Sequence, residues 1–485
     1  MRLGRLPNYQ PASFFSCGHP SVMGKSNSDV PHVSHSDFSH LLDRSAHDAY
    51  RTIIPYPEHR IPIRLHHVPN LLLPLIPFFS MAYLSRRPDT FYLRLLLLPL
   101  VICLTCGTYF RFMYTEPELN IYNWGQGEGL VSGPVASRNI TQLDVFFVPI
   151  GLFAELICGK AIDYAWRRDG MLKAGETKPG VLSKSPSVCH CCNGNFDGCA
   201  SVDCKEVSSY TAPPRNTSLP PWLYDAFEVT LTIRGQGWQF GADLYVSRDP
   251  RPSRRSAFLW ATVISTLKHV LVFDTLESLI KLVPEVGSPH GGTIFKQNLP
   301  IIQRYILSTA IHLAMGTCLI AGFEMVHGCI TLLGLIAFSS SPEMWPPLMD
   351  NPWISDSLHV FWAKRWHQVL RQTFFVYGGF LGKWLAGDIG MLFGTFFASG
   401  MYHECAAYLL GKGFNWHVVL FFTSQALLLL LEKLWRRVTG KRVGGIYGRL
   451  WVYFCIFVMA QPLGTYVRCS NVCLLFIVIS QWIHG

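Results

Sequence analysis

Residues 305–322 read YILSTAIHLAMGTCLIAG and contain no Asp, Glu, Lys or Arg. A helix of this length, at about 1.5 Å per residue, spans roughly 27 Å, which is close to the thickness of the hydrocarbon core of a bilayer. Buried helices of soluble proteins seldom reach this length without a charge. The stretch therefore predicts a membrane-spanning helix.

Similar apolar runs extend this prediction over much of the chain. Charged residues are also absent from residues 413–431, 451–467 and 469–485. Further candidate segments are residues 69–84, 95–110, 145–160, 258–282, 325–340 and 374–410. We expect an all-α polytopic membrane protein with about eight to ten membrane helices, some of them tilted or re-entrant.

The composition supports lipid as part of the solvent. Of 485 residues, 49% are hydrophobic and only 15% are charged, against about 25% charged in ordinary soluble domains. The net charge of +10 comes from Lys and Arg clustered in loops, such as residues 433–449. Such clusters favour the cytoplasmic side of a membrane and do not indicate nucleic-acid binding. No apolar region follows the basic Met1–Arg5 start, so we expect no cleavable signal peptide and insertion through the first helix as a multi-pass protein of the endoplasmic reticulum.

The chain is predicted to have four parts. Residues 1–65 are polar and read as a flexible tail, and residues 66–166 hold the first membrane helices. Residues 167–221 form a polar, Cys-rich insertion predicted to lie in the cytosol, and residues 222–485 form the core. The cysteine spacing between Cys189 and Cys204 is not that of paired C-x2-C units, so we expect free thiols there and no metal site.

Ionisable residues within apolar segments are costly and point to function. His403 and Glu404 follow a run of 14 residues, 389–402, without a charge, and Ser399 lies one helical turn before His403 on the same face. A single histidine on an apolar helix is more often a core residue than a functional one. The neighbouring Glu404 and Ser399 make His403 the leading candidate for chemistry.

A second candidate segment is rich in aromatic and basic residues. Residues 357–368 contain Trp362, Arg365 and Trp366 directly before an apolar run. An interfacial aromatic and basic belt accounts for those three residues. It accounts less well for His367 and Gln368, which follow them.

Together these segments resemble a known family. Residues 345–368, which begin WPPLMDNP and end RWHQ, and the sequence SGMYHE at residues 399–404 look like the signature of wax-synthase-like membrane-bound O-acyltransferases. The sequence RGQGW at residues 234–238 resembles an RGxGW element of fungal members. The resemblance covers residue 222 to the C-terminus, and the tail and the Cys-rich insertion lie outside it.

The resemblance implies a chemistry and a set of site residues. His403 matches the invariant histidine of the family, and His367 stands where other branches carry Asn. Both are therefore predicted to be catalytic, in a chamber inside the helix bundle. The role of His367, whether positioning the acyl carbonyl, binding the alcohol or sharing proton transfer, stays open. The residues predicted to bind substrate are Trp362, Arg365, Trp366, Gln368, Ser399, Glu404, Arg234 and Trp238.

The expected reaction moves an acetyl or other acyl group from acyl-CoA to the hydroxyl of a lipophilic alcohol. The fungal likeness favours acetyl-CoA as co-substrate and a terpenoid or meroterpenoid acceptor, with long-chain alcohols or sterols as the alternative. Neither a metal nor a bound cofactor is expected. The sequence contains no G-x-S-x-G and no H-x3-D motif. A transporter using Lys383, Asp388, His403 and Glu404 is the competing class, and a non-catalytic scaffold is a third.

Overall fold

A computed structural model describes residue 48 and residues 50–56, 59–63, 65–113, 142–182, 220–283, 294–409 and 416–460. The chain divides into two compact units, Met1–Tyr50 and Arg51–Gly485. Nearly all of the described residues belong to the second unit. The 189–204 cysteine cluster, most of the predicted tail and the predicted helix at residues 469–485 lie outside the described residues.

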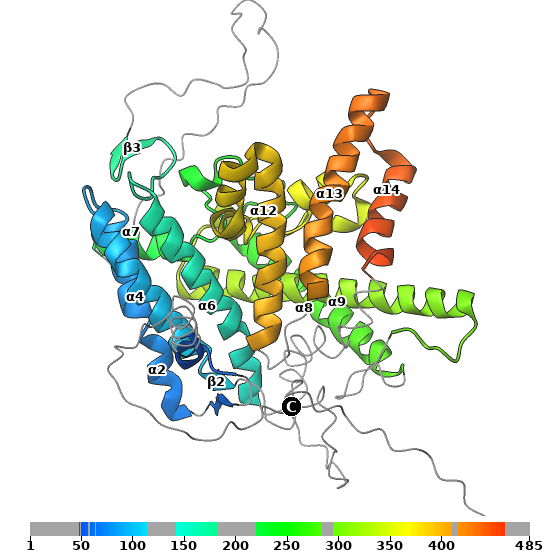
Figure 1. Cartoon of the computed structure of the whole chain (residues 1–485), viewed down its shortest axis with the longest axis horizontal. Helices are drawn as coiled ribbons and strands as arrows, with labels where there is room; N and C mark the ends of the chain where they lie inside the picture. The colour runs from blue at the N-terminus through cyan, green and yellow to red at the C-terminus, as the bar shows by residue number, and fades with distance from the viewer. Residues whose placement is uncertain are drawn as a thin grey trace, which may run out of the picture. The chain divides into compact units, whose positions relative to one another are not determined.

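The second unit is mostly helical, as expected (Figure 1). Its longer helices are α3 (Leu75–Leu84), α4 (Phe91–Tyr109), α6 (Gln142–Trp166), α7 (Pro221–Leu231), α8 (Arg255–Lys281), α9 (Ile301–Ala337), α12 (Phe380–Leu409), α13 (Trp416–Thr439) and α14 (Gly445–Tyr453). Shorter helical segments are α2 (Val68–Leu72), α10 (Leu358–Val360), η7 (Phe361–Arg365), α11 (Arg371–Phe374), η8 (Phe375–Gly379) and η9 (Phe454–Val458). Two small two-stranded sheets pair β1 (Ile61–Pro62) with β2 (Phe112–Met113) and β3 (Glu176–Lys178) with β4 (Val181–Leu182).

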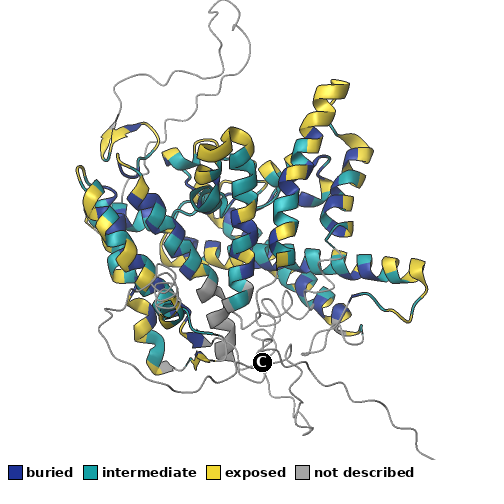
Figure 2. Ribbon diagram, in the orientation of Figure 1, coloured by how far each residue is buried: buried dark blue, intermediate teal, exposed yellow. Residues whose placement is uncertain are grey.

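Within the described residues, four helices are long and apolar enough to cross a membrane. They are α4, α8, α9 and α13, and two shorter apolar stretches cover Val68–Leu84 and Gly445–Val458. Many of their large apolar side chains are exposed on the protein surface, as lipid-facing positions require (Figure 2). The polytopic helical membrane fold is thus confirmed, whereas the total of eight to ten helices stays a prediction.

One long helix replaces two predicted ones. Residues 305–322 and 325–340 were expected to form separate spans, but α9 runs unbroken from Ile301 to Ala337. The two residues between these segments are Phe323 and Glu324. Neither is Gly or Pro, so neither ends the helix. Helix α9 packs along its length against α8, so the prediction of two spans here was wrong.

The predicted apolar segment 374–410 folds back on itself. Ala386 and Gly387 leave helical geometry, and Gly387 takes a φ of 59°, which glycine adopts without strain. Glycines allow the two arms to touch: a Cβ at Gly382 would lie 2.0 Å from the carbonyl oxygen of Gly390. Lys383 and Asp388 are exposed at the tip of this turn. This position removes both from the buried ion path that a transporter would need.

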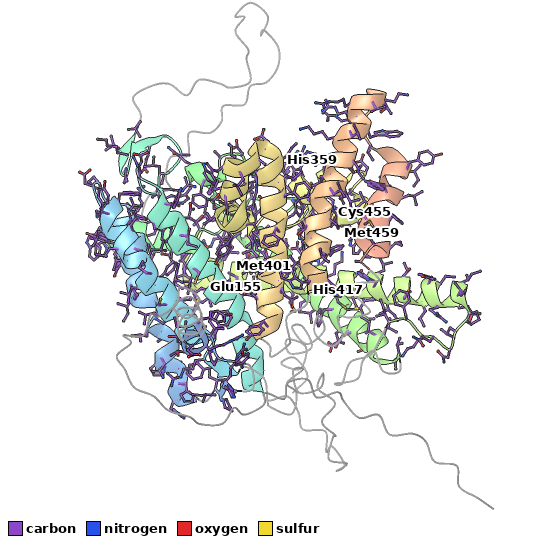
Figure 3. All side chains as sticks on the ribbon, in the orientation of Figure 1. Glu155, His359, Met401, His417, Cys455 and Met459 are labelled. Atoms are coloured by element: carbon purple, nitrogen blue, oxygen red, sulfur yellow. The ribbon has the colours of Figure 1, made fainter. Side chains whose placement is uncertain are left out.

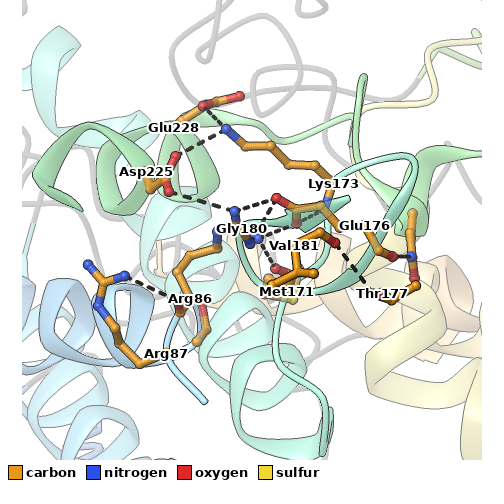
Figure 4. A network of polar contacts seen from close by, with 12 residues as sticks. Arg86, Arg87, Met171, Lys173, Glu176, Thr177, Gly180, Val181, Asp225 and Glu228 are labelled. Carbon is orange, nitrogen blue, oxygen red and sulfur yellow. Dashed lines mark hydrogen bonds and ion pairs between the residues drawn. The ribbon is translucent and has the colours of Figure 1, made fainter. Parts of the chain in front are cut away.

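The N-terminal helices form a block with its own core, held by a charged network. Helices α3, α4, α6 and α7 pack around buried residues such as Phe78, Tyr164 and Trp238. Beside them, Arg86 makes two hydrogen bonds to the carboxylate of Glu176, at 2.6 and 2.9 Å (Figure 4). This pair ties the end of α3 to the β3–β4 hairpin.

Candidate active site

The candidate site is a cavity of about 340 Å³ between α9, α12, α13, the segment 352–374 and the α14–η9 segment. Both predicted catalytic histidines, His367 and His403, line it. The walls are mainly aromatic, and the lining residues include Trp353, Phe361, Trp362, Trp366, Phe374, Phe396, Phe421, Phe422, Tyr453 and Phe457. Side chains fill the space between the surrounding helices, where Figure 3 labels Met401 on α12 and His417 at the start of α13. The cavity is therefore a largely apolar chamber with three imidazoles in its wall, since His312 of α9 lines it as well.

His403 is held in one orientation by the helix that carries it. Its Nδ1 lies 2.6 Å from the backbone carbonyl oxygen of Ser399, one turn earlier on α12. A carbonyl oxygen can only accept, so Nδ1–H is the donor. In the neutral ring, Nε2 then keeps its lone pair. The ring stacks on Phe422 with centroids 4.3 Å apart and an interplanar angle of 18°. The sequence placed Ser399 one turn before His403 on the same face, and in the structure the backbone carbonyl of Ser399 makes the contact.

His367 enters the same cavity from the loop after η7. Its ring packs between Phe323 and Trp366, with centroid distances of 5.0 and 5.2 Å. Its Nδ1 is buried and has no hydrogen-bond partner in the described part of the chain. A buried polar nitrogen without a partner costs free energy unless a ligand satisfies it. His367 therefore has an unsatisfied ring nitrogen in the cavity wall, and its role toward a substrate stays a prediction.

The wall that carries Trp362 is fixed by two buried polar residues of α13, which sequence reasoning missed. The carboxylate of Glu432 accepts hydrogen bonds from the backbone N–H groups of Leu358 and His359, at 2.6 and 3.0 Å, and from Nε1 of Trp451 at 3.0 Å. Nε1 of Trp362 donates to Oε1 of Gln425, which is fully buried. The only sequence signal for either residue was a polar side chain in or next to an apolar run.

Gln368 closes the same wall from the other side. Its Nε2 donates to the carbonyl oxygens of Trp362 and Trp366, at 2.8 and 2.9 Å. Gln368, Trp362, Trp366 and Ser399 all line the cavity, while their contact with a substrate stays a prediction. With its amide nitrogen used by the backbone, Gln368 shapes the wall around His367.

Four predicted substrate-binding residues do not line the cavity. Arg365 donates to the carbonyl of Asp350 at 2.8 Å, and Glu404 is fully buried in α12 next to His403. Arg234 donates to the carbonyls of Pro346 and Pro347, at 3.3 and 3.1 Å. Trp238 is buried in the core of the N-terminal block. For Arg234 and Arg365 the contacts order the 345–351 segment that leads to the site, while a direct contact with substrate stays a prediction.

The glycines of the RGQGW sequence explain how Arg234 and Trp238 point in opposite directions. Gly235 and Gly237 have φ values of 75° and 74°, in the left-handed region that glycine tolerates. Trp238 turns into the N-terminal block, where the guanidinium of Arg86 lies 5.2 Å from its ring centroid. The turn therefore connects that block to the 345–351 segment through Arg234.

Comparison with known proteins agrees with this geometry. Residues 345–424 match the model of the membrane bound O-acyl transferase family. The matched range contains His367, His403 and most of the cavity wall between them. This segment, about a sixth of the chain, is thus similar to the membrane-bound O-acyltransferase family. No solved structure matches the chain.

Several fungal proteins named acetyltransferases are similar to it. Acetyltransferase sirH of Emericella nidulans is 26% identical over 48% of this chain and 56% of its own length. Acetyltransferase eriL of Hericium erinaceus is 25% identical over 43% of this chain and 57% of its own. Acetyltransferase aurG of Calcarisporium arbuscula is 26% identical over 45% of this chain and 57% of its own length. The match thus spans little more than half the length of each of these relatives.

Proposed function

We propose that this protein is a membrane-bound O-acyltransferase that transfers an acyl group from acyl-CoA to the hydroxyl of a lipophilic alcohol. The observation that carries the proposal is the orientation of His403. Its Nδ1 is bonded to the Ser399 carbonyl, and the ring is part of the wall of an apolar cavity. The remaining nitrogen is then available as a base toward a bound hydroxyl.

The chemistry needs one base and an activated donor. As the alcohol oxygen attacks the thioester carbonyl carbon, Nε2 of His403 takes the hydroxyl proton. The tetrahedral intermediate then collapses, the C–S bond breaks, and the imidazolium returns the proton to the departing CoA thiolate. Ester and free CoA leave with all atoms and charges balanced. The dry aromatic wall keeps water from competing with the alcohol for the thioester.

His367 has the complementary role in this proposal. Its buried, unpartnered Nδ1 is suited to a hydrogen bond with the acyl carbonyl or with the alcohol. Arg371, whose guanidinium donates to the carbonyl of Asp243, lines the cavity and provides a positive charge for the phosphates of CoA. No protein-bound metal or covalent intermediate is needed, because the thioester is already activated.

For the substrates we favour acetyl-CoA and a polycyclic terpenoid or meroterpenoid alcohol of secondary metabolism. The names of the fungal relatives support acetyl as the transferred group. The aromatic wall, with Trp353, Trp362 and Phe422, offers flat apolar surfaces to a rigid ring system. Fatty acyl transfer to long-chain alcohols or sterols is the alternative. We place the protein in the membrane of the endoplasmic reticulum.

The test is acyl transfer in isolated membranes, with radiolabelled acetyl-CoA or a radiolabelled long-chain acyl-CoA as donor and a panel of terpenoid, sterol and long-chain alcohols as acceptors. Replacing His403 by Ala should lower the rate by about 10²- to 10⁴-fold, the usual contribution of a placed general base. His359→Ala is the matched control, because His359 is exposed and lies outside the cavity lining. Equal rates for His403→Ala and wild type at equal expression would refute the proposal, and transfer confined to fatty acyl donors would establish the alternative.

A further inference from the structure

The C-terminal end of α13 and the turn into α14 form a strongly basic surface. Residues 433–449, here called the basic hairpin, hold six cations and no carboxylate: Lys433, Arg436, Arg437, Lys441, Arg442 and Arg449. All six are exposed. No carboxylate of the described chain forms an ion pair with any of them. The charge of this surface is therefore not neutralised by the described protein.

Large apolar side chains lie among these cations. Trp435, Val438, Ile446 and Tyr447 are 53%, 75%, 63% and 82% exposed. Exposed aromatic and aliphatic groups interleaved with Lys and Arg are typical of the boundary between lipid tails and headgroups. There the apolar groups enter the acyl region while the cations reach outward. The composition of the basic hairpin thus fits a membrane surface better than water.

The position of the basic hairpin along the chain also indicates that it lies at a membrane surface. Helix α13 is a candidate membrane span, and its charge-free part ends at Leu431, followed by Glu432 and then Lys433. The cations therefore begin where the span leaves the hydrocarbon. Clusters of four to eight Lys and Arg at such a place attract anionic lipids, at about a fivefold gain in affinity for each cation.

The hairpin is also rigidly mounted. Gly448 packs so closely on Asp356 that a Cβ would lie 1.9 Å from the Asp356 carbonyl oxygen. The residues that flank the hairpin are also joined: the indole N–H of Trp451 donates to the carboxylate of Glu432 at 3.0 Å. A fixed array of cations loses less conformational entropy on binding than a mobile loop would.

We propose that the basic hairpin binds the headgroups of anionic phospholipids, with phosphatidylserine as the representative ligand. The cations contact phosphate and carboxylate oxygens, while Trp435, Ile446 and Tyr447 enter the acyl region beside them. This binding needs no acyl transfer and stands independently of the reaction proposed above.

The test measures lipid binding to the purified full-length protein in an uncharged detergent. The midpoint of thermal unfolding is titrated with dioctanoyl phosphatidylserine, dioctanoyl phosphatidylcholine and CoA. For the wild type, phosphatidylserine should raise the midpoint at lower concentration than phosphatidylcholine, because a ligand that binds the native state stabilises it. The triple substitution R436Q, R437Q and R442Q should weaken the apparent affinity for phosphatidylserine by about a hundredfold, at about fivefold for each cation.

The matched control keeps the charge. The triple substitution R436K, R437K and R442K should retain the preference for phosphatidylserine, since attraction to an anionic surface depends on charge rather than on the guanidinium. Equal responses of the wild type to both lipids would overturn the proposal. So would a Gln variant that keeps the preference, or one that loses only CoA binding, which would assign the cations to the donor's phosphates.

Discussion

Replacement of Glu432 tests how far a buried carboxylate holds the wall of the cavity. Glu432 is 9% exposed and accepts from three donors: the buried N–H of Leu358, the partly buried N–H of His359 and the partly buried indole N–H of Trp451. A donor left unpaired inside a protein costs about 1–3 kcal/mol. Glu432→Ala removes the partner of all three donors, so we expect it to lower the free energy of unfolding by about 3 kcal/mol, with the largest share from the buried N–H of Leu358.

The Gln variant at the same position is the internal control. Its side-chain oxygen can replace Oε1, which serves Leu358 and Trp451, while its amide nitrogen faces the N–H of His359. Only one donor is then unpaired, so Glu432→Gln should cost about a third as much as Glu432→Ala.

The assay is the midpoint of thermal unfolding in detergent micelles. In a domain of 150–250 residues, 1 kcal/mol moves this midpoint by about 2–4 °C, and the shift per kcal/mol is smaller in a longer chain. The criterion is therefore the order of the unfolding midpoints: highest for the wild type, lower for Glu432→Gln and lowest for Glu432→Ala. If Glu432→Ala melts at or above Glu432→Gln, the carboxylate does not hold the wall, and the reasoning fails.

Two further predictions concern other contacts. Burial alone would raise the pKa of Glu176, but the hydrogen bonds and charge of Arg86, with backbone N–H groups, bring that pKa below its ordinary value. The stabilisation is therefore present above the ordinary glutamate pKa of about 4.3 and is lost as the pH falls through the lower pKa of the folded state. The thermal unfolding midpoints of wild type and Glu176→Gln should converge in that acid range. A difference between the two midpoints that does not change with pH would contradict this. Gly448→Ala should lower the free energy of unfolding by about 1–3 kcal/mol, because the added Cβ overpacks against the Asp356 carbonyl. Gly444→Ala is the control: its Cβ would lie 3.6 Å from Asp356 Oδ2, so the unfolding midpoint should stay nearly unchanged.

Much of the fold could be predicted because lipid imposes a simple rule on sequence. Charge-free runs of about 18 residues or more seldom form anything but membrane-spanning helices. In the described residues, the candidate spans α9 and α13 contain most of the runs at 305–322 and 413–431. Where that rule failed, local geometry was the reason. Periodicity and charge count cannot show that α9 continues through Glu324, or that Ala386 and Gly387 reverse the chain.

The sequence alone identified His367 and His403 as the candidate catalytic pair, because two histidines beside apolar runs, at a spacing known from one family, are an unusual pattern. Only the tertiary structure brings them to one cavity, turns Nδ1 of His403 onto the Ser399 carbonyl and assigns Glu432 and Gln425 to the wall. It also moves Arg234 away from the cavity to the carbonyls of Pro346 and Pro347. A hydrogen bond between residues more than 60 positions apart depends on how helices pack, and no local pattern records that packing.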